Sequence, residues 1–262
     1  MISTIKQTKN NVFKKIIKAV FITAFWILIW EISSRIVSRN NELLLLILPS
    51  PITVLKKWVH IAFTLPFIKA TLLTLARIFI GFFIGTILGF IIGILTHISS
   101  VIYSLLSPIL KIIRAVPVVA IIILMYLFFS SATLPILIVC LMVLPIVWQS
   151  VNDGLNRTDI KLLEMASTFN LSRLKTLRKV KLPYILPSFV TTCVNALGLA
   201  WKSGVAAEVI CLPNTSLGTL LWQGKGAVNY DEVYSITLTV VLLSIAIEIL
   251  LKFLLKGGKA DD

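Results

Sequence analysis

Residues that commonly carry out chemistry are scarce in this sequence. Among its 262 residues are two histidines, His60 and His97, and three cysteines, Cys140, Cys193 and Cys211. The sequence has no C-x-x-C pair, no H-E-x-x-H and no G-x-S-x-G, so we expect no disulfide, no metal site and no catalytic residue. It also lacks G-x-x-x-x-G-K-[ST], which excludes a fused ATPase of that kind, and we expect this chain to bind no cofactor.

Charged residues are also few, and acidic ones are the scarcer kind. Charged side chains make up 14% of the sequence and hydrophobic ones 58%, with a formal net charge of +14. A soluble fold exposes too much surface to hide this many apolar side chains, so we expect a membrane protein. The basic residues lie between apolar runs, which favours contact with anionic lipid over nucleic acid.

Six apolar runs are long enough to cross a bilayer, which takes about 20 residues. Backbone groups in lipid must bond within their own segment, so each run is predicted to be a helix and the fold class all-α. Prolines in the third and fourth runs predict kinks, and the short turn 130–133 between them predicts an antiparallel pair. The predicted spans are about 16–36, 71–95, 108–129, 132–152, 185–208 and 233–255.

The distribution of lysine and arginine predicts the orientation. Most of them precede the first span, lie in the loop 153–184 or follow the last span, and such an excess is typical of the cytoplasmic side. We therefore expect both termini and this loop in the cytoplasm. The predicted organisation is a tail, first span and external segment over 1–70, a core over 71–255, and a cytoplasmic tail over 256–262.

The segment 37–70 is ambiguous. Residues 43–48 are apolar but too few to span a membrane, and Pro49-Ser50-Pro51 ends the run. Residues 52–65 have the pattern of an amphipathic helix lying at the outer membrane surface. A short re-entrant piece is the alternative.

The loop 153–184 has a helical pattern of its own. Thr158 or Asp159 can cap a short helix that begins near Ile160. A short helix with an exposed apolar stripe needs a partner surface, and an ordinary basic loop with a fortuitous helix is the alternative. The apolar residues that fall on one face at helical spacing are Leu162, Leu163, Ala166 and Phe169.

The same loop carries a longer motif. Glu164-Met165-Ala166 is followed by Asn170 and, after nine intervening residues, by Val180-Lys181-Leu182-Pro183. This resembles the E-A-A-x3-G-x9-I-x-L-P signature of permeases of binding-protein-dependent ABC importers. Met165 and Asn170 depart from it, but asparagine is the next best residue after glycine for a left-handed helix end.

The resemblance implies a type I importer permease (MetI-like) fold with a cytoplasmic coupling helix between spans four and five. That helix would dock on a separate ATPase subunit, which binds the ATP and Mg²⁺. It also implies an external solute-binding protein, a second permease copy, for which we expect a homodimer, and a place in the bacterial plasma membrane. The interface residues that it implies are Glu164, Ala166, Asn170, Leu182 and Pro183.

Shorter matches suggest a branch of this family. Leu48-Pro49-Ser50-Pro51, Arg114-Ala115-Val116-Pro117 and Ala207-Glu208 are similar to the nitrate, sulfonate and taurine permeases. The resemblance implies a small solute of that kind. A thiamine precursor or another small heterocycle is the alternative.

Several residues within the spans are candidates for packing or for the solute pathway. Gly81, Gly85, Gly89 and Gly93 share one helix face and predict close helix packing. Lys202 is a candidate to attract an anionic solute. The alternative is a structural role, in which it snorkels to the interface or pairs with Glu31 or Glu248. Trp201 either lines the pathway or packs, and Glu208 is expected to anchor the following loop. The possible pathway residues are Arg114, Pro117, Trp201, Lys202 and Glu208.

Two other classes of function are weaker candidates. A membrane-embedded enzyme lacks a credible catalytic set in this sequence. A channel or secondary transporter would not need the E-A-A-type loop, and the sequence shows no evident inverted repeat.

Overall fold

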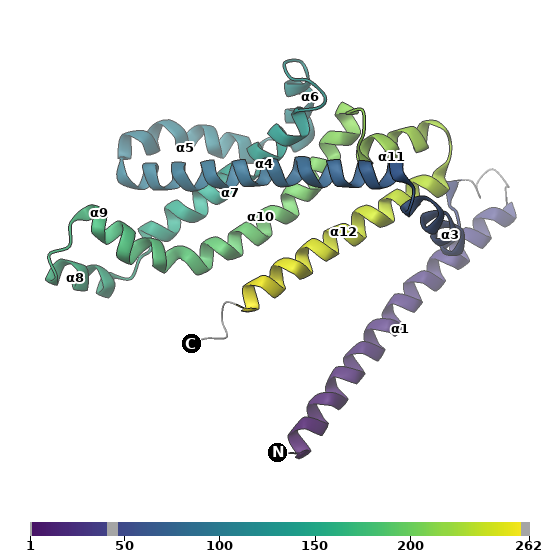
Figure 1. Cartoon of the computed structure of the whole chain (residues 1–262), viewed down its shortest axis with the longest axis horizontal. Helices are drawn as coiled ribbons and strands as arrows, with labels where there is room; N and C mark the ends of the chain where they lie inside the picture. The colour runs from purple at the N-terminus through teal and green to yellow at the C-terminus, as the bar shows by residue number, and fades with distance from the viewer. Residues whose placement is uncertain (1, 41–46, 258–262) are drawn as a thin grey trace. The chain divides into compact units, whose positions relative to one another are not determined.

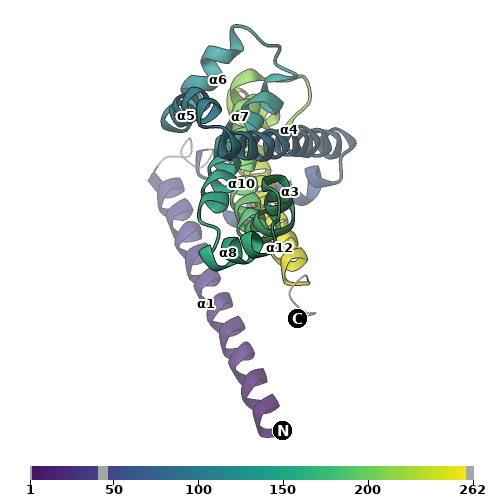
Figure 2. The same cartoon turned by 90° about the vertical axis from the view of Figure 1, so that its left-hand side faces the viewer.

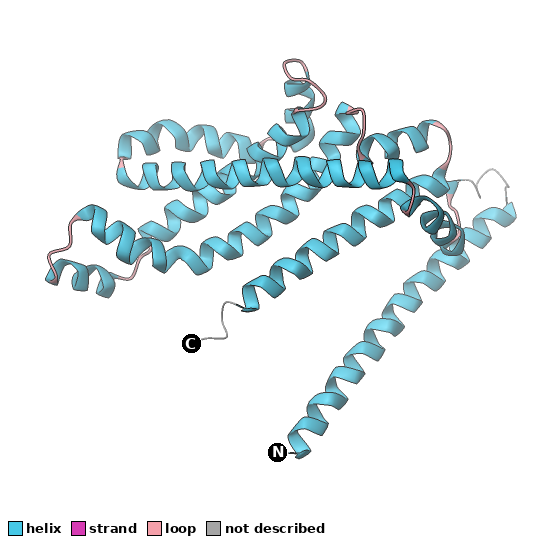
Figure 3. Ribbon diagram, in the orientation of Figure 1, coloured by secondary structure: helices cyan, strands magenta, loops and turns pink. Residues whose placement is uncertain are grey.

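The computed structural model describes residues 2–40 and 47–257, which form helices joined by loops (Figures 1 and 3). Residues 41–46 of the ambiguous segment and 258–262 of the predicted tail lie outside the described residues. The helices are α1 (Ile2–Asn40), α3 (Pro51–Ala62), α4 (Leu65–Ile98), α5 (Ser100–Ala115), α6 (Val118–Tyr126), α7 (Leu134–Asn156), α8 (Ile160–Thr168), α9 (Arg173–Thr176), the π-helical turn η1 (Leu177–Lys181), α10 (Leu182–Cys211), α11 (Leu217–Gly226) and α12 (Tyr230–Gly257).

Five helical segments in the described part of the chain are long and apolar enough to cross a membrane. They confirm an all-α membrane fold and overlap the predicted spans one, two, four, five and six. Their limits are Val20–Val37, Leu65–Ile98, Leu134–Asn156, Arg173–Cys211 and Tyr230–Leu251.

The predicted third span, 108–129, is not one helix. α5 begins earlier, at Ser100, and ends at Ala115, and α6 then leaves at an angle of 104°. Proline has no N–H to continue the helix and disfavours the helical conformation in the residue before it. Val116, which precedes Pro117, accordingly has extended dihedrals of φ −77° and ψ 134°. The pair is a broken span or a re-entrant loop, and the number of spans is six only in the first case.

Contacts divide the chain into two compact units. The smaller contains residues up to 64 together with 223–238. In it, the Ser34 hydroxyl donates to the Leu48 carbonyl over 2.8 Å, and the Ser235 hydroxyl donates to the Val54 carbonyl over 3.0 Å. The sequence predicts the helix α3 but not that 223–238 joins the N-terminal segment. The place of α3 at the membrane surface stays a prediction.

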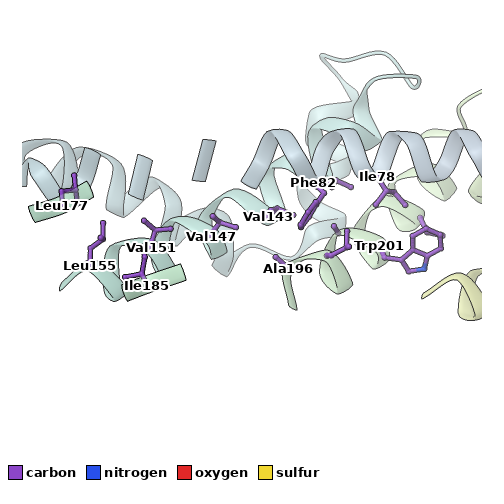
Figure 4. Close-up of a cluster of buried hydrophobic side chains, with 14 residues drawn as sticks. Ile78, Phe82, Val143, Val147, Val151, Leu155, Leu177, Ile185, Ala196 and Trp201 are labelled. Atoms are coloured by element: carbon purple, nitrogen blue, oxygen red, sulfur yellow. The ribbon is translucent and has the colours of Figure 1, made fainter. Parts of the chain in front are cut away.

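The larger unit contains residues 65–222 and the part of α12 after residue 238. α4 runs beside α7 (Figures 1 and 2), and α10 packs against both. Figure 4 shows the apolar core that these helices share; its labelled residues are Ile78, Phe82, Val143, Val147, Val151, Leu155, Leu177, Ile185, Ala196 and Trp201.

The four predicted packing glycines bring the backbones of α4 and α7 together. A Cβ atom at Gly81, Gly85 or Gly89 would lie 2.5–2.7 Å from a carbonyl oxygen of α7, and at Gly93 it would lie 2.7 Å from the Val151 Cβ. Contacts this short exclude any side chain without separation of the helices. The repeat of four residues keeps the contact on one face over the length of the pair.

Substitution of Gly89 tests this contact. We expect Gly89→Ala to lower the free energy of unfolding by about 1–3 kcal/mol, because the new methyl group overpacks the helix pair. Gly198→Ala in α10 is the matched control, since no atom lies within 4 Å of its Cβ position. Both changes replace a helical glycine by a better helix former. Thermal unfolding in detergent checks this, and equal midpoints for the two variants would contradict the contact.

Candidate functional site

The helix α8 begins where the sequence predicts it. Asp159 is the N-cap residue, and its carboxylate accepts a hydrogen bond from the Lys161 backbone N–H over 2.9 Å. This bond satisfies one of the N–H groups that the first turn leaves without a helical partner. The helix start is therefore fixed by a local interaction.

The end of α8 is fixed by a Schellman motif. Asn170 has a φ of +49°. Its N–H donates to the Ser167 carbonyl over 2.9 Å, and the Leu171 N–H donates to the Ala166 carbonyl over 3.0 Å. Asparagine therefore occupies the left-handed position for which glycine is the usual residue.

The apolar residues of α8 divide between two faces. Ala166 is 2% exposed, and Leu162 and Leu163 are half-buried. Phe169 is 72% exposed. The sequence places all four on one stripe toward a partner, but the first three face the rest of this chain. The exposed apolar side chains of this segment are Ile160, Met165 and Phe169, with the exposed Glu164 between them.

The turn η1 packs against α8. Leu177 is buried, and a cavity of about 600 Å³ lies between η1, α8 and the end of α4. η1 continues into α10 with helical dihedrals at Lys181, so α9, η1 and α10 follow one another without a break. Residues 169–172 connect α8 to them. Leu182 and Pro183 are the first residues of α10; Leu182 is half-buried and Pro183 is exposed.

Polar side chains tie three helices together beside this cavity. His97 of α4 contacts the Asn156 side-chain oxygen of α7 through Nδ1 at 2.7 Å and the Lys181 ammonium through Nε2 at 3.0 Å. A neutral ring protonated on Nδ1 satisfies both contacts. The residues are far apart in sequence, so no local pattern reveals this cluster.

A second polar cluster joins α4 to the last turn of α10. Glu208 is completely buried. Its carboxylate accepts hydrogen bonds from the Arg77 guanidinium over 3.0 Å and from the Thr74 hydroxyl over 2.8 Å. Arg77 also donates to the Thr215 carbonyl over 2.9 Å, and Thr74 accepts from the Leu217 N–H over 3.0 Å. The cluster therefore holds the loop after α10 and the start of α11.

The remaining pathway candidates do not come together at one place. Trp201 is buried, and its indole N–H donates to the Val240 carbonyl over 3.2 Å. Lys202, the next residue, is exposed. Arg114 and Pro117 are exposed near the break between α5 and α6. The polar groups of Trp201 and Glu208 are thus bound within the chain, whereas the other three residues can reach solvent or a partner.

The sequence did not identify the Arg77–Glu208 pair, although it singled out Glu208 as an anchor of the following loop. The signal that could have found it is the presence of opposite charges in two spans, because such charges usually face one another or a cavity. Their separation of 131 residues means that only the packing of α4 against α10 brings them together.

Comparison with known proteins gives one family. The family model described as "binding-protein-dependent transport system inner membrane component" matches residues 81–257. A probable ABC transporter permease protein of Haemophilus influenzae is 29% identical over 251 residues, which cover 92% of this chain and 96% of that protein. The taurine transport system permease protein TauC of Escherichia coli is 29% identical over 219 residues, which cover 81% and 76%.

Solved structures share the fold at lower identity. One is the MetNI methionine ABC transporter in an inward-facing conformation, with a TM-score of 0.63, 20% identity and coverage of 72% of this chain and 94% of that chain. Another is an amino acid ABC transporter with histidines, with a TM-score of 0.65, 18% identity and coverage of 76% and 96%.

The buried ion pair gives the first prediction for this site. We expect Arg77→Met to lower the free energy of unfolding by about 3–5 kcal/mol, because it leaves the Glu208 carboxylate buried without its countercharge. The double variant Arg77→Met with Glu208→Met should recover part of this loss. Unfolding of both variants in detergent checks it, and a single variant as stable as the parent would contradict it.

The Asn170 conformation gives the second prediction. Asn170→Gly should preserve α8, whereas Asn170→Val should destabilise its C-terminal turn by about 1–2 kcal/mol, because a β-branched residue is strained at positive φ. Hydrogen exchange of the α8 amides measures both effects. Equal exchange in the two variants would show that the positive φ does not matter.

Proposed function

This chain belongs to the family of binding-protein-dependent transport system inner membrane components, and from this premise we propose that α8 is the surface on which its ATPase subunit docks. Members of the family are membrane permeases of ABC importers, in which a partner subunit supplies the ATPase activity. The observation that supports the proposal is the exposed apolar group of Ile160, Met165 and Phe169 on a helix fixed at both ends.

The chemistry of this surface suits a protein partner. When another protein covers the exposed apolar side chains of a short capped helix, their removal from water stabilises the complex. Aromatic residues at the centre of such a contact typically carry much of its energy. Phe169 fits this role, while Ala166, Leu162 and Leu163 act as the support of α8. Glu164, Asn170, Leu182 and Pro183 border the contact or shape it.

The same arrangement can transmit motion. α8 packs against η1, η1 continues into α10, and the His97 cluster joins η1 to α4 and α7. A displacement of α8 by the ATPase therefore acts on the membrane helices rather than on a flexible loop. ATP and Mg²⁺ bind to the partner, and this chain holds no cofactor.

The proposed assembly has two copies of this chain, two ATPase subunits and an external solute-binding protein. One chain offers one α8, so two ATPase subunits require two permease copies, and a homodimer is the simplest arrangement. Both termini and α8 lie in the cytoplasm, by the distribution of basic residues. The relatives named for taurine and aliphatic sulfonates support a small sulfonate-like solute.

Substitution of Phe169 tests the docking. We expect Phe169→Ala to weaken association with the ATP-binding subunit about tenfold or more, because it removes an aromatic anchor. Phe128→Ala is the matched control, since Phe128 is 74% exposed and Phe169 72%, and it lies in the turn after α6. Association is measured by copurification of the coexpressed subunits at graded concentration.

Two outcomes of this experiment distinguish the proposal from its rivals. Loss of ATPase association in Phe169→Ala but not in Phe128→Ala supports docking through α8. Retention at parental affinity in both Phe169→Ala and Met165→Glu contradicts it.

A further inference from the structure

The span α10 carries a polar face that the rest of the described chain leaves uncovered. Its exposed residues follow one another at intervals of three or four, so they lie on one side of the helix. They are Tyr184, Ser188, Thr191, Asn195, Leu199 and Lys202, and we call them the α10 polar face. The candidate span Arg173–Cys211, which contains α10, is also the least apolar of those found in the described residues.

The opposite side of α10 is packed. Ala196, Ala200 and Gly204 are buried against the core shared with α4 and α7. This packing fixes the rotation of the helix about its axis. The α10 polar face therefore cannot turn inward, and it must meet water, lipid or another protein.

Two side chains of the α10 polar face, Asn195 and Lys202, need a polar environment. By contrast, the hydroxyls of Ser188 and Thr191 bond to carbonyls of their own helix. The Asn195 amide and the Lys202 ammonium make no side-chain hydrogen bond or ion pair within the described residues. Lys202 lies nine residues before the end of α10 at Cys211, or about two and a half turns. Uncompensated polar groups inside a span usually face a water-filled cavity.

A cavity opens beside this face. It has a volume of about 320 Å³ between α10 and α12 and is lined by Asn195 and Gly198 on one wall and by Ser244 and Glu248 on the other. No atom lies within 4 Å of the Cβ position of Gly198. The volume matches the lower end of the range for small-molecule sites, so the cavity can hold a small solute.

We propose that the α10 polar face is a wall of the aqueous solute pathway and that Lys202 makes this wall selective for anions. The proposal rests on the importer function proposed above and specifies where the solute passes. Glu248 already has an interaction within the structure, so the Lys202 ammonium is the charge that this face offers to a solute. Gly198 lies four residues before Lys202, which places the two on neighbouring turns of the same side.

Thiol labelling tests whether water reaches the face. Cysteine is introduced as Asn195→Cys or Gly198→Cys after Cys140, Cys193 and Cys211 are changed to serine, in the assembled transporter in membrane vesicles. A methanethiosulfonate reagent that carries a sulfonate and one that carries a quaternary ammonium are compared. Both positions should react at least tenfold faster than Cys193 retained alone, because Cys193 lies on the packed side of the same helix.

Two results would overturn the aqueous wall. Reaction at both positions no faster than at Cys193 means that lipid or protein covers the face. Oxidative cross-linking of two chains through Gly198→Cys, together with that slow labelling, means that a second copy covers it.

The charge of Lys202 is tested in the same vesicles. At Gly198→Cys, the ratio of anionic to cationic labelling rates should fall at least threefold when Lys202→Gln is added, because the ammonium attracts the sulfonate reagent. Lys202→Arg should keep the ratio. An unchanged ratio in Lys202→Gln refutes anion selection by this residue.

The two proposals can fail separately. Labelling reports whether water reaches the α10 polar face, and ATPase association is measured separately on the same preparations. Slow labelling with intact association overturns the pathway wall alone. Fast labelling with association that does not depend on Phe169 overturns the docking role of α8 alone.

Discussion

The contact between the backbones of α4 and α7 is the constraint on which the rest of the larger unit depends. Glycine at every fourth residue of α4 lets the helices approach until any Cβ atom would clash. α4 also carries two polar clusters: Arg77, twelve residues after its start, binds Glu208, and His97 in its last turn contacts Asn156 and Lys181. Twenty residues separate Arg77 from His97, which is about 30 Å of helix and equals the thickness of the hydrocarbon core.

This spacing allows one cluster to lie near each surface of the membrane. Polar groups belong near the two surfaces of a membrane, and the apolar core of Figure 4 lies along the helices between them. α10 takes part in both clusters, through Glu208 near its end and through Lys181 just before its start. α10 is therefore the element through which a push on α8 can reach the opposite end of the unit.

The sequence predicted the features that depend on neighbouring residues. The Asp159 cap, the start of α8 at Ile160 and the left-handed Asn170 all follow from short-range backbone chemistry. The third span has the kink that its prolines predict, at Pro117, but apolar length shows neither its angle of 104° nor the start of α5 at Ser100. The exposed face of α8 was misjudged: helical spacing groups Ala166 with Phe169, but only the contact with η1 decides which side is covered. The His97 and Glu208 clusters join residues about 60 to 130 positions apart and need the packed fold.

The central claim is that α8 touches the motor subunit, and a photocrosslinker tests it most directly. Benzoylphenylalanine is placed at position 169 or, for comparison, at position 128 in the assembled transporter, and the covalent products are identified by mass spectrometry after illumination. The account predicts an adduct with the ATP-binding subunit from position 169 and none from position 128. Adducts from position 169 that contain only lipid, or only the external binding protein, would contradict it.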